Sequence, residues 1–159
     1  DREWSTSALS ENQVGWDWFA LQLSDGQDLM YYQLRLADGS PDPLSKGILV
    51  DREGGAMLLT SEMVELEVTE KWESPEDGTL YPSGWRLAIP SQRTEFTVTP
   101  LIPGQELNLT FRYWEGAVEV RGVSDGTPVE GRGYVELTGY SEGQDSVGKR
   151  SLGRGRSRP

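Results

Sequence analysis

Residues 15–23 have the sequence GWDWFALQL, in which two tryptophans enclose an aspartate. In a β-strand, successive side chains point to opposite faces of the sheet, so Asp17 shares its face with Phe19, while Trp16 and Trp18 share the other. Whichever face points to the core therefore carries something unusual. Either an aspartate is at least half-buried, or two indoles line an outer surface that a ligand or a partner domain could cover.

The same period of two recurs along almost the whole chain, and Gly-containing turn signals separate the segments. Two of these signals, Asp25-Gly26 and Asp38-Gly39, suit tight hairpins because glycine accepts a positive φ. The pattern predicts an all-β, antiparallel sandwich or barrel of about ten strands, near the number that closes a barrel. The expected strands cover residues 15–23, 29–36, 46–50, 56–59, 63–72, 85–89, 94–99, 107–111, 117–123 and 134–140.

Composition removes several classes of chemistry. The 159 residues include neither cysteine nor histidine, which excludes disulfides, thiolate nucleophiles, Ser-His-Asp and Cys-His catalysis, and nearly all zinc and copper site designs. The charged turn at residues 51–55 offers too few oxygen ligands for calcium. The sequence therefore predicts no metal site.

Charge is distributed unevenly along the chain. The last 19 residues hold five of the 15 basic and two of the 26 acidic residues, so residues 1–140 carry a net charge of −14. A body this acidic repels phosphate backbones, and no nucleic-acid partner is expected. Residues 141–159 are rich in Gly, Ser and Arg and are predicted to form a disordered basic tail. No run approaches the roughly 18 apolar residues that a membrane span needs.

Carboxylates lie beside aromatic residues at three places: Glu3-Trp4, Asp17 between two tryptophans, and Tyr113-Trp114-Glu115. Burial beside indole raises the pKa of a carboxylic acid and lets it donate a proton, while aromatic faces attract a developing cation. A pair of acids can divide the general acid and base roles. The alternative is that the tryptophans fill the core and Asp17 faces water.

Residues 81–86, YPSGWR, are typical of a turn that enters a strand. Arg86 is then placed to bind a carboxylate or phosphate, or to lie over Trp85.

Six segments together resemble the AttH-like family, which includes the carotenoid hydratases, also called hydroxyneurosporene synthases. They are DREWSTSAL at 1–9, GWDWFALQL at 15–23, LMYYQLR at 29–35, YPSGWRLAIP at 81–90, YWEGAVEVRG at 113–122 and GRGYVELTGY at 131–140. The resemblance covers about residues 1–140 and is specific in its tryptophan positions.

The resemblance implies a lipocalin-like (calycin-type) β-barrel. Members of the family contain two such halves, and residues 1–140 match the C-terminal one, so an N-terminal half is an expected partner with the ligand cavity near their contact. It also implies an apolar isoprenoid or lipid-like substrate and, in the hydratase branch, addition of water across a double bond without a cofactor. Many bacterial relatives are described as secreted and accompany transporter components, which favours a periplasmic or secreted location.

Within the resemblance, Asp17 or Glu3 is the expected proton donor, and Trp4, Trp16, Trp18 and Tyr32 are expected to flank a carbocation-like centre. Tyr113 and Glu115 are expected to hold water, and Trp85, Arg86 and Trp114 complete the expected substrate-binding set. Other branches place histidine near the first motif. This chain has Arg2 there, so a mechanism that relies on imidazole is not available to it.

Three functions remain open at this stage. The domain is a hydratase-type enzyme with carboxylate acid catalysis, or a lipocalin-like carrier that hands a lipid or pigment to a membrane transporter. The third function is that of a scaffold, in which the aromatic residues of the first expected strand bind the other half of the protein.

Overall fold

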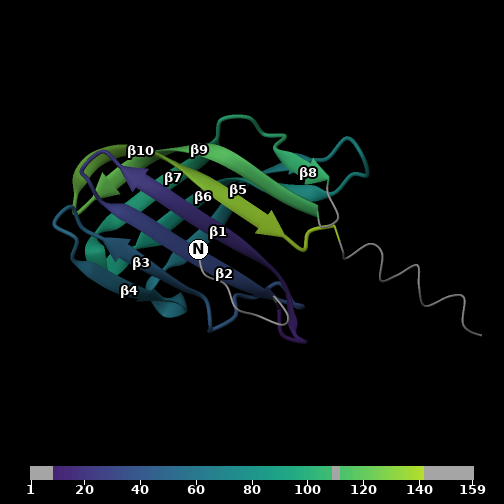
Figure 1. Ribbon diagram of the computed structural model, residues 1–159, viewed down its shortest axis with the longest axis horizontal. Helices are drawn as coiled ribbons and strands as arrows, with labels where there is room; N and C mark the ends of the chain where they lie inside the picture. The colour runs from purple at the N-terminus through teal and green to yellow at the C-terminus, as the bar shows by residue number, and fades with distance from the viewer. Residues whose placement is uncertain (1–8, 109–111, 142–159) are drawn as a thin grey trace, which may run out of the picture.

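The computed structural model describes residues 9–108 and 112–141, and it is all-β and antiparallel, as the sequence predicts (Figure 1). Two short 3-10 turns, η1 (Ser61–Met63) and η2 (Pro90–Gln92), interrupt the strands. The ten strands of the described residues are β1 (Gln13–Leu23), β2 (Asp28–Leu36), β3 (Lys46–Val50), β4 (Ala56–Thr60), β5 (Glu65–Glu73), β6 (Leu80–Ile89), β7 (Thr94–Pro100), β8 (Glu106–Asn108), β9 (Arg112–Ser124) and β10 (Thr127–Thr138).

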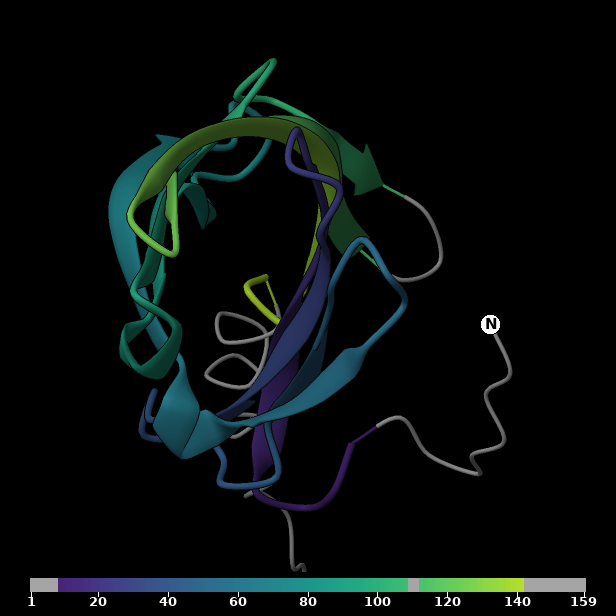
Figure 2. The same ribbon diagram turned by 90° about the vertical axis from the view of Figure 1, so that its left-hand side faces the viewer.

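All ten strands belong to one sheet, in the order β4-β3-β2-β1-β10-β9-β7-β6-β5, with β8 paired to β9. The sheet curls so strongly that it encloses its own core, and Figure 2 shows the strands arranged in a ring. Its two edge strands, β4 and β5, follow one another in the chain through η1. A sheet that curls in this way buries one face and leaves the other outside.

The inner face carries the core. Phe19 packs edge-on against Trp85, with ring centroids 5.6 Å apart, and Trp85 packs against Trp114 at 5.9 Å. Burying side chains of this size stabilises the fold by about 1.5–3 kcal/mol each. Other fully buried residues come from both halves of the sheet: Leu21, Leu29, Tyr31, Leu59, Tyr81, Leu87, Ile89, Phe96 and Leu137.

The hairpin signals are confirmed. Gly26 and Gly39 have φ values of +86° and +84° in the turns that follow β1 and β2. A third Asp-Gly pair forms the two-residue connection between β9 and β10, where Asp125 and Gly126 have φ values of 48° and 77°. Two positive φ values in a two-residue loop define a type I′ turn, whose twist matches that of the strands.

The turn predicted at residues 81–84 is wrong. β6 begins at Leu80, and Pro82 lies within it opposite Lys71 of β5. The register is irregular between Val68 and Lys71, where bulges absorb the missing N–H of proline on an edge pair. The Pro and Gly of this segment therefore lie inside a strand and do not form a turn before it.

The strand predicted at residues 107–111 begins one residue earlier, at Glu106 of β8. Leu107 is 40% exposed, whereas the side chain of Glu106 is only 8% exposed. The remainder of the strand predicted at 107–111 lies partly outside the described residues, as does the basic tail from residue 142 onward. Both stay predictions.

The sheet needs glycine at Gly133, which lies opposite Leu21 of β1. A Cβ atom there would be 2.2 Å from the carbonyl oxygen of Ala20. We expect Gly133→Ala to lower the free energy of unfolding by about 1–3 kcal/mol, because β10 must move away from β1. The neighbouring exposed substitution Arg132→Ala is the control, and urea denaturation measures both. Equal losses in the two variants would contradict this close approach.

Candidate functional site

Asp17 points into the barrel and is only 2% exposed. Its carboxylate forms an ion pair with Arg35 of β2, and the Tyr140 hydroxyl donates to both carboxylate oxygens at 3.0 Å. Arg35 also lies 3.8 Å above the Tyr140 ring and donates to the carbonyl oxygen of Thr138. One arginine thus ties β1, β2 and the end of β10 together.

Burial raises the pKa of Asp17, while the charge of Arg35 and the hydrogen bond from Tyr140 act in the opposite direction. The acid is therefore both buried and engaged. This arrangement gives Asp17 a structural role at the end of the barrel, and a catalytic role for it stays a prediction.

A second inner carboxylate, Glu106, was missed by sequence reasoning. It accepts hydrogen bonds from Tyr81 at 2.9 Å and Ser74 at 2.6 Å, and its Oε1 lies 3.2 Å from Nε of Arg112. The Tyr81 and Tyr140 rings are 5.7 Å apart, so the two inner carboxylate groups lie at the same end of the barrel. Only the register of β8 on β9 could reveal this placement.

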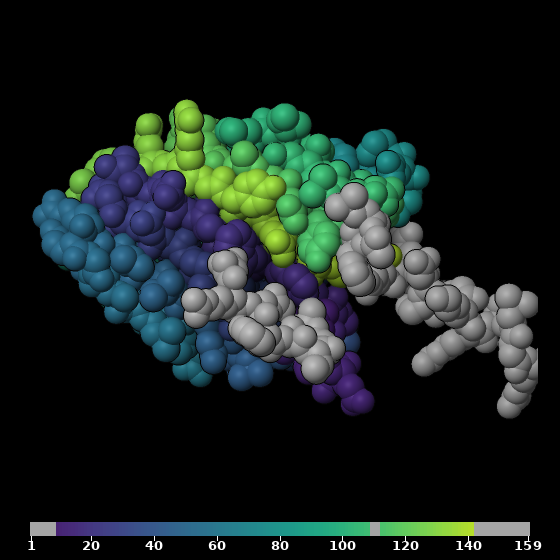
Figure 3. Space-filling view, viewed as in Figure 1, coloured from purple at the N-terminus to yellow at the C-terminus, as the bar shows by residue number. Residues whose placement is uncertain are grey.

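The outer face of the sheet collects most of the other predicted residues. Trp18 lies directly opposite Tyr32 of β2 on one side and Glu136 of β10 on the other, and Glu136 lies opposite Glu115 of β9. Tyr113, Glu115 and Trp16 share this face by their phase along the strands. β1, β2 and β10 lie side by side toward the viewer in Figures 1 and 3. The four-residue row Tyr32–Trp18–Glu136–Glu115 is called the outer row below.

Each carboxylate of the outer row accepts a hydrogen bond from an aromatic side chain. The indole N–H of Trp16 donates to Glu136 Oε1 at 2.7 Å, and the Tyr134 hydroxyl donates to Glu115 Oε2 at 3.3 Å. Tyr134 and Glu136 were not among the predicted site residues. Their alternation in β10 was visible in the sequence, but the pairing that brings them beside Trp18 and Glu115 was not.

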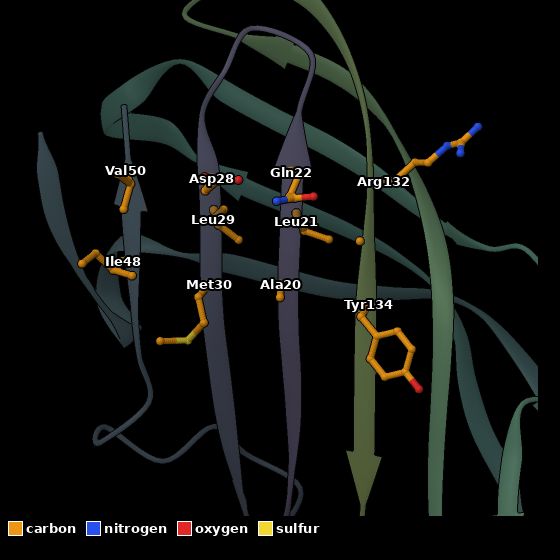
Figure 4. Close-up of a pocket in the computed structure, with 11 residues that line it drawn as sticks. Ala20, Leu21, Gln22, Asp28, Leu29, Met30, Ile48, Val50, Arg132 and Tyr134 are labelled. Atoms are coloured by element: carbon orange, nitrogen blue, oxygen red, sulfur yellow. The ribbon is translucent and has the colours of Figure 1, made fainter. Parts of the chain in front are cut away.

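A groove of about 550 Å³ adjoins the outer row. Ala20 forms its floor between the longer side chains of Met30 and Tyr134, as Figure 4 shows. The lining is mainly apolar, with polar groups toward the β1–β2 hairpin. The residues around it are Ala20, Leu21, Gln22, Asp28, Leu29, Met30, Ile48, Val50, Arg132, Gly133 and Tyr134.

The remaining predicted residues lie elsewhere. Trp85 and Trp114 are fully buried in the core. Arg86 lies on β6, where it forms ion pairs with Glu95 at 2.6 Å and Glu65 at 3.5 Å, away from the outer row. The structure therefore does not bring Arg86 together with Trp16 and Trp18. Glu3 and Trp4 lie outside the described residues.

The described ranges, 9–108 and 112–141, contain no group of three or more Asp, Glu, His or Cys side chains that could hold a metal ion. They also contain no helix with the length and hydropathy needed to cross a bilayer.

The curled antiparallel sheet agrees with the comparisons to known proteins. The model of the AttH-like family matches residues 1–140. The chain belongs to the AttH-like family. Its fold is similar to the crystal structure of a protein from Nitrosomonas europaea named as an AttH, with a TM-score of 0.75 and 38% identity over 86% of this chain and 42% of that one.

A second similar fold is that of kievitone hydratase from Nectria haematococca, with a TM-score of 0.71 and 22% identity over 88% of this chain and 43% of that one. This AttH-like chain thus spans less than half the length of either solved protein. No protein of curated function matched the sequence.

The buried pair of Asp17 and Arg35 makes a stability prediction. Asp17→Asn leaves the Arg35 charge without its counter-ion, and we expect a loss of about 3–5 kcal/mol in the free energy of unfolding. Replacing both residues, as in Asp17→Asn with Arg35→Met, should recover part of this loss. Asp125→Asn is the control, because Asp125 pairs with Arg93 on the surface, with side chains 73% and 75% exposed. A loss no larger than that of the control would remove the structural role of Asp17.

Alkaline pH should weaken the fold through its buried tyrosines. Burial raises the pKa of Tyr31 to about 12 from 10, and the pKa values of Tyr81 and Tyr140 are also raised, mainly by burial. Below pH 10, tyrosine is protonated in both the folded and the unfolded state, and the contribution of the buried tyrosines to the free energy of unfolding is fully present. As the pH rises from 10 toward 12, tyrosine ionises in the unfolded state first, so this contribution is lost. Tyr31→Phe should reduce this slope. Urea midpoints between pH 9 and pH 12 measure it, and an unchanged slope would count against the assignment.

Proposed function

We propose that this AttH-like domain is part of a hydratase-type enzyme that binds an apolar, isoprenoid or lipid-like molecule on the outer face of β1, β2 and β10. The supporting observation is the outer row with the adjoining groove of about 550 Å³. A volume of this size lies in the range of small-molecule sites, and an apolar lining with few polar groups suits an apolar ligand.

The aromatic side chains of this face support the choice of ligand. Trp16 and Trp18 are half-buried on a surface that the core does not use, and aromatic faces bind polyenes and stabilise a developing positive charge. Protonation of a double bond generates such a charge. A hydratase adds water to its substrate. The resemblance to the AttH-like family implies this reaction, and the fold is similar to that of a kievitone hydratase.

We propose that a second, N-terminal lipocalin-like half covers this face. Outward tryptophans and the exposed Leu58 of β4, which pairs with Ile48 at the groove, form an apolar surface larger than single scattered residues. A ligand held between two halves would be shielded from water. The two solved relatives are each more than twice as long as the part of them that this chain covers, which leaves room for such a partner.

The second candidate function is a carrier without chemistry. It is supported by the ion pair of Asp17 with Arg35, which engages the acid that the sequence favoured as proton donor. A carrier needs the groove and its aromatic rim but no acid. A carrier of this kind would also associate with a membrane transporter, to which it hands its ligand.

Binding and turnover separate these functions. We expect the full-length protein in which this domain is proposed to lie to bind the fluorescent polyene cis-parinaric acid, and Trp18→Ala to weaken binding about tenfold through lost aromatic contact. Incubation with lycopene in H2¹⁸O should give a product heavier by one labelled water, detected by mass spectrometry.

Leu101→Ala is the matched control for binding, because Leu101 is an exposed apolar residue in the loop after β7 and is not part of the groove. Binding with no labelled product would favour the carrier. Equal affinities of wild type, Trp18→Ala and Leu101→Ala would contradict a ligand site on this face.

A further inference from the structure

We propose that Glu115 and Glu136 are the acid–base pair of this site, Glu115 giving a proton to a double bond of the ligand and Glu136 taking one from the water that adds. This inference rests on the proposed function. The groove and the aromatic residues of the outer row keep their role in binding, and the chemistry is assigned to the two carboxylates at one end of the outer row.

The pairing of these two residues is an exception within their own strands. β9 and β10 bring three pairs of charged side chains face to face on the outer surface. Glu130 lies opposite Arg121, and Arg132 lies opposite Glu119, so both of these pairs join opposite charges. Only the third pair in this ladder, Glu136 opposite Glu115, joins two acids.

Like charges directly opposite each other destabilise a sheet, because their Cβ atoms are about 4.5–5.5 Å apart. A packing role would be served as well by an acid and a base, as the other two pairs show. The cost of two neighbouring carboxylates is explained if the site uses them together.

The neighbouring aromatic donors distinguish the two acids. Trp16 holds Glu136 with the shorter hydrogen bond, 2.7 Å, and Tyr134 holds Glu115 at 3.3 Å. Burial, together with the charges of both glutamates, raises the pKa of Tyr134, so its hydroxyl stays a donor. We therefore assign the base to Glu136 and the acid to Glu115.

The proposed step balances. The Glu115 carboxyl group transfers its proton to one carbon of the double bond, and the water oxygen forms a bond to the other carbon. Glu136 accepts the proton that the water loses. One water has then been added, and the single proton of the pair has moved from Glu115 to Glu136. Transfer between these cross-strand neighbours restores the starting state.

The position of the pair fits a ligand in the groove. Tyr134, which contacts Glu115 through its hydroxyl, also lines the groove. Trp18 lies between Tyr32 and Glu136 in the outer row, so an aromatic face is next to the carbon that becomes positive. Attraction between that face and the cation would act in the transition state.

Isosteric substitutions in the full-length protein test the pair. We expect Glu115→Gln and Glu136→Gln each to lower the rate of ¹⁸O-water addition to lycopene at least 100-fold, because each removes one proton-transfer group. Binding of cis-parinaric acid should change less than twofold. Glu119→Gln is the matched control, since Glu119 lies on the same face of β9 but opposite Arg132, and its rate should equal that of wild type.

A stability measurement separates chemistry from folding. The melting temperature of Glu115→Gln should not fall, because the substitution removes a like-charge contact. If wild type adds water to lycopene and either Glu115→Gln or Glu136→Gln does so at the same rate, the assignment of the acid–base pair is wrong, while the proposed function is unaffected. Binding by wild type without any addition of water would overturn both.

Discussion

The alternation of side chains along β1 is the constraint on which the rest of the structure depends. Because successive residues of a strand point to opposite faces, the inward position of Phe19 also puts Asp17 inside and Trp16 and Trp18 outside. A slip of one residue would exchange these sets and place two indoles in the core. The register of β1 against β2 and β10 therefore decides both how the barrel is stabilised and where a ligand could bind.

The inside of the barrel combines an aromatic core with buried ion pairs at one end. Asp17 pairs with Arg35 and Glu106 pairs with Arg112, and each carboxylate also accepts a hydrogen bond from a tyrosine hydroxyl. Buried charges are costly unless they are paired. Here Thr138 and Tyr140 also connect the Asp17–Arg35 pair to the end of β10, more than 100 positions away in the sequence. This end is held by specific polar contacts in addition to apolar packing.

The outside of the sheet has a different character on β1, β2 and β10. Sheets of this kind normally present polar residues to water, but here Trp16 and Trp18 are half-buried on the outer face, next to a groove that Met30 and Tyr134 line. The sheet thus separates two sets of acids. The inner ones pair with arginines, and Glu115 and Glu136 accept hydrogen bonds from aromatic donors near that groove.

The sequence by itself determined the all-β antiparallel class, nearly every strand, the Asp-Gly turns and the AttH-like family, because these depend on local periodicity, turn chemistry and motif. It also singled out Trp16, Trp18, Tyr32 and Glu115. Only the tertiary structure decided that the face of Asp17 is the inner one and the face of Trp16 and Trp18 the outer one. It also decided that YPSGWR is part of a strand and that Glu136 and Tyr134 lie on the outer face near these tryptophans. The physical reason is that strand pairing joins residues more than 100 positions apart, such as Trp18 and Glu136, and no local pattern encodes which residues will be opposite.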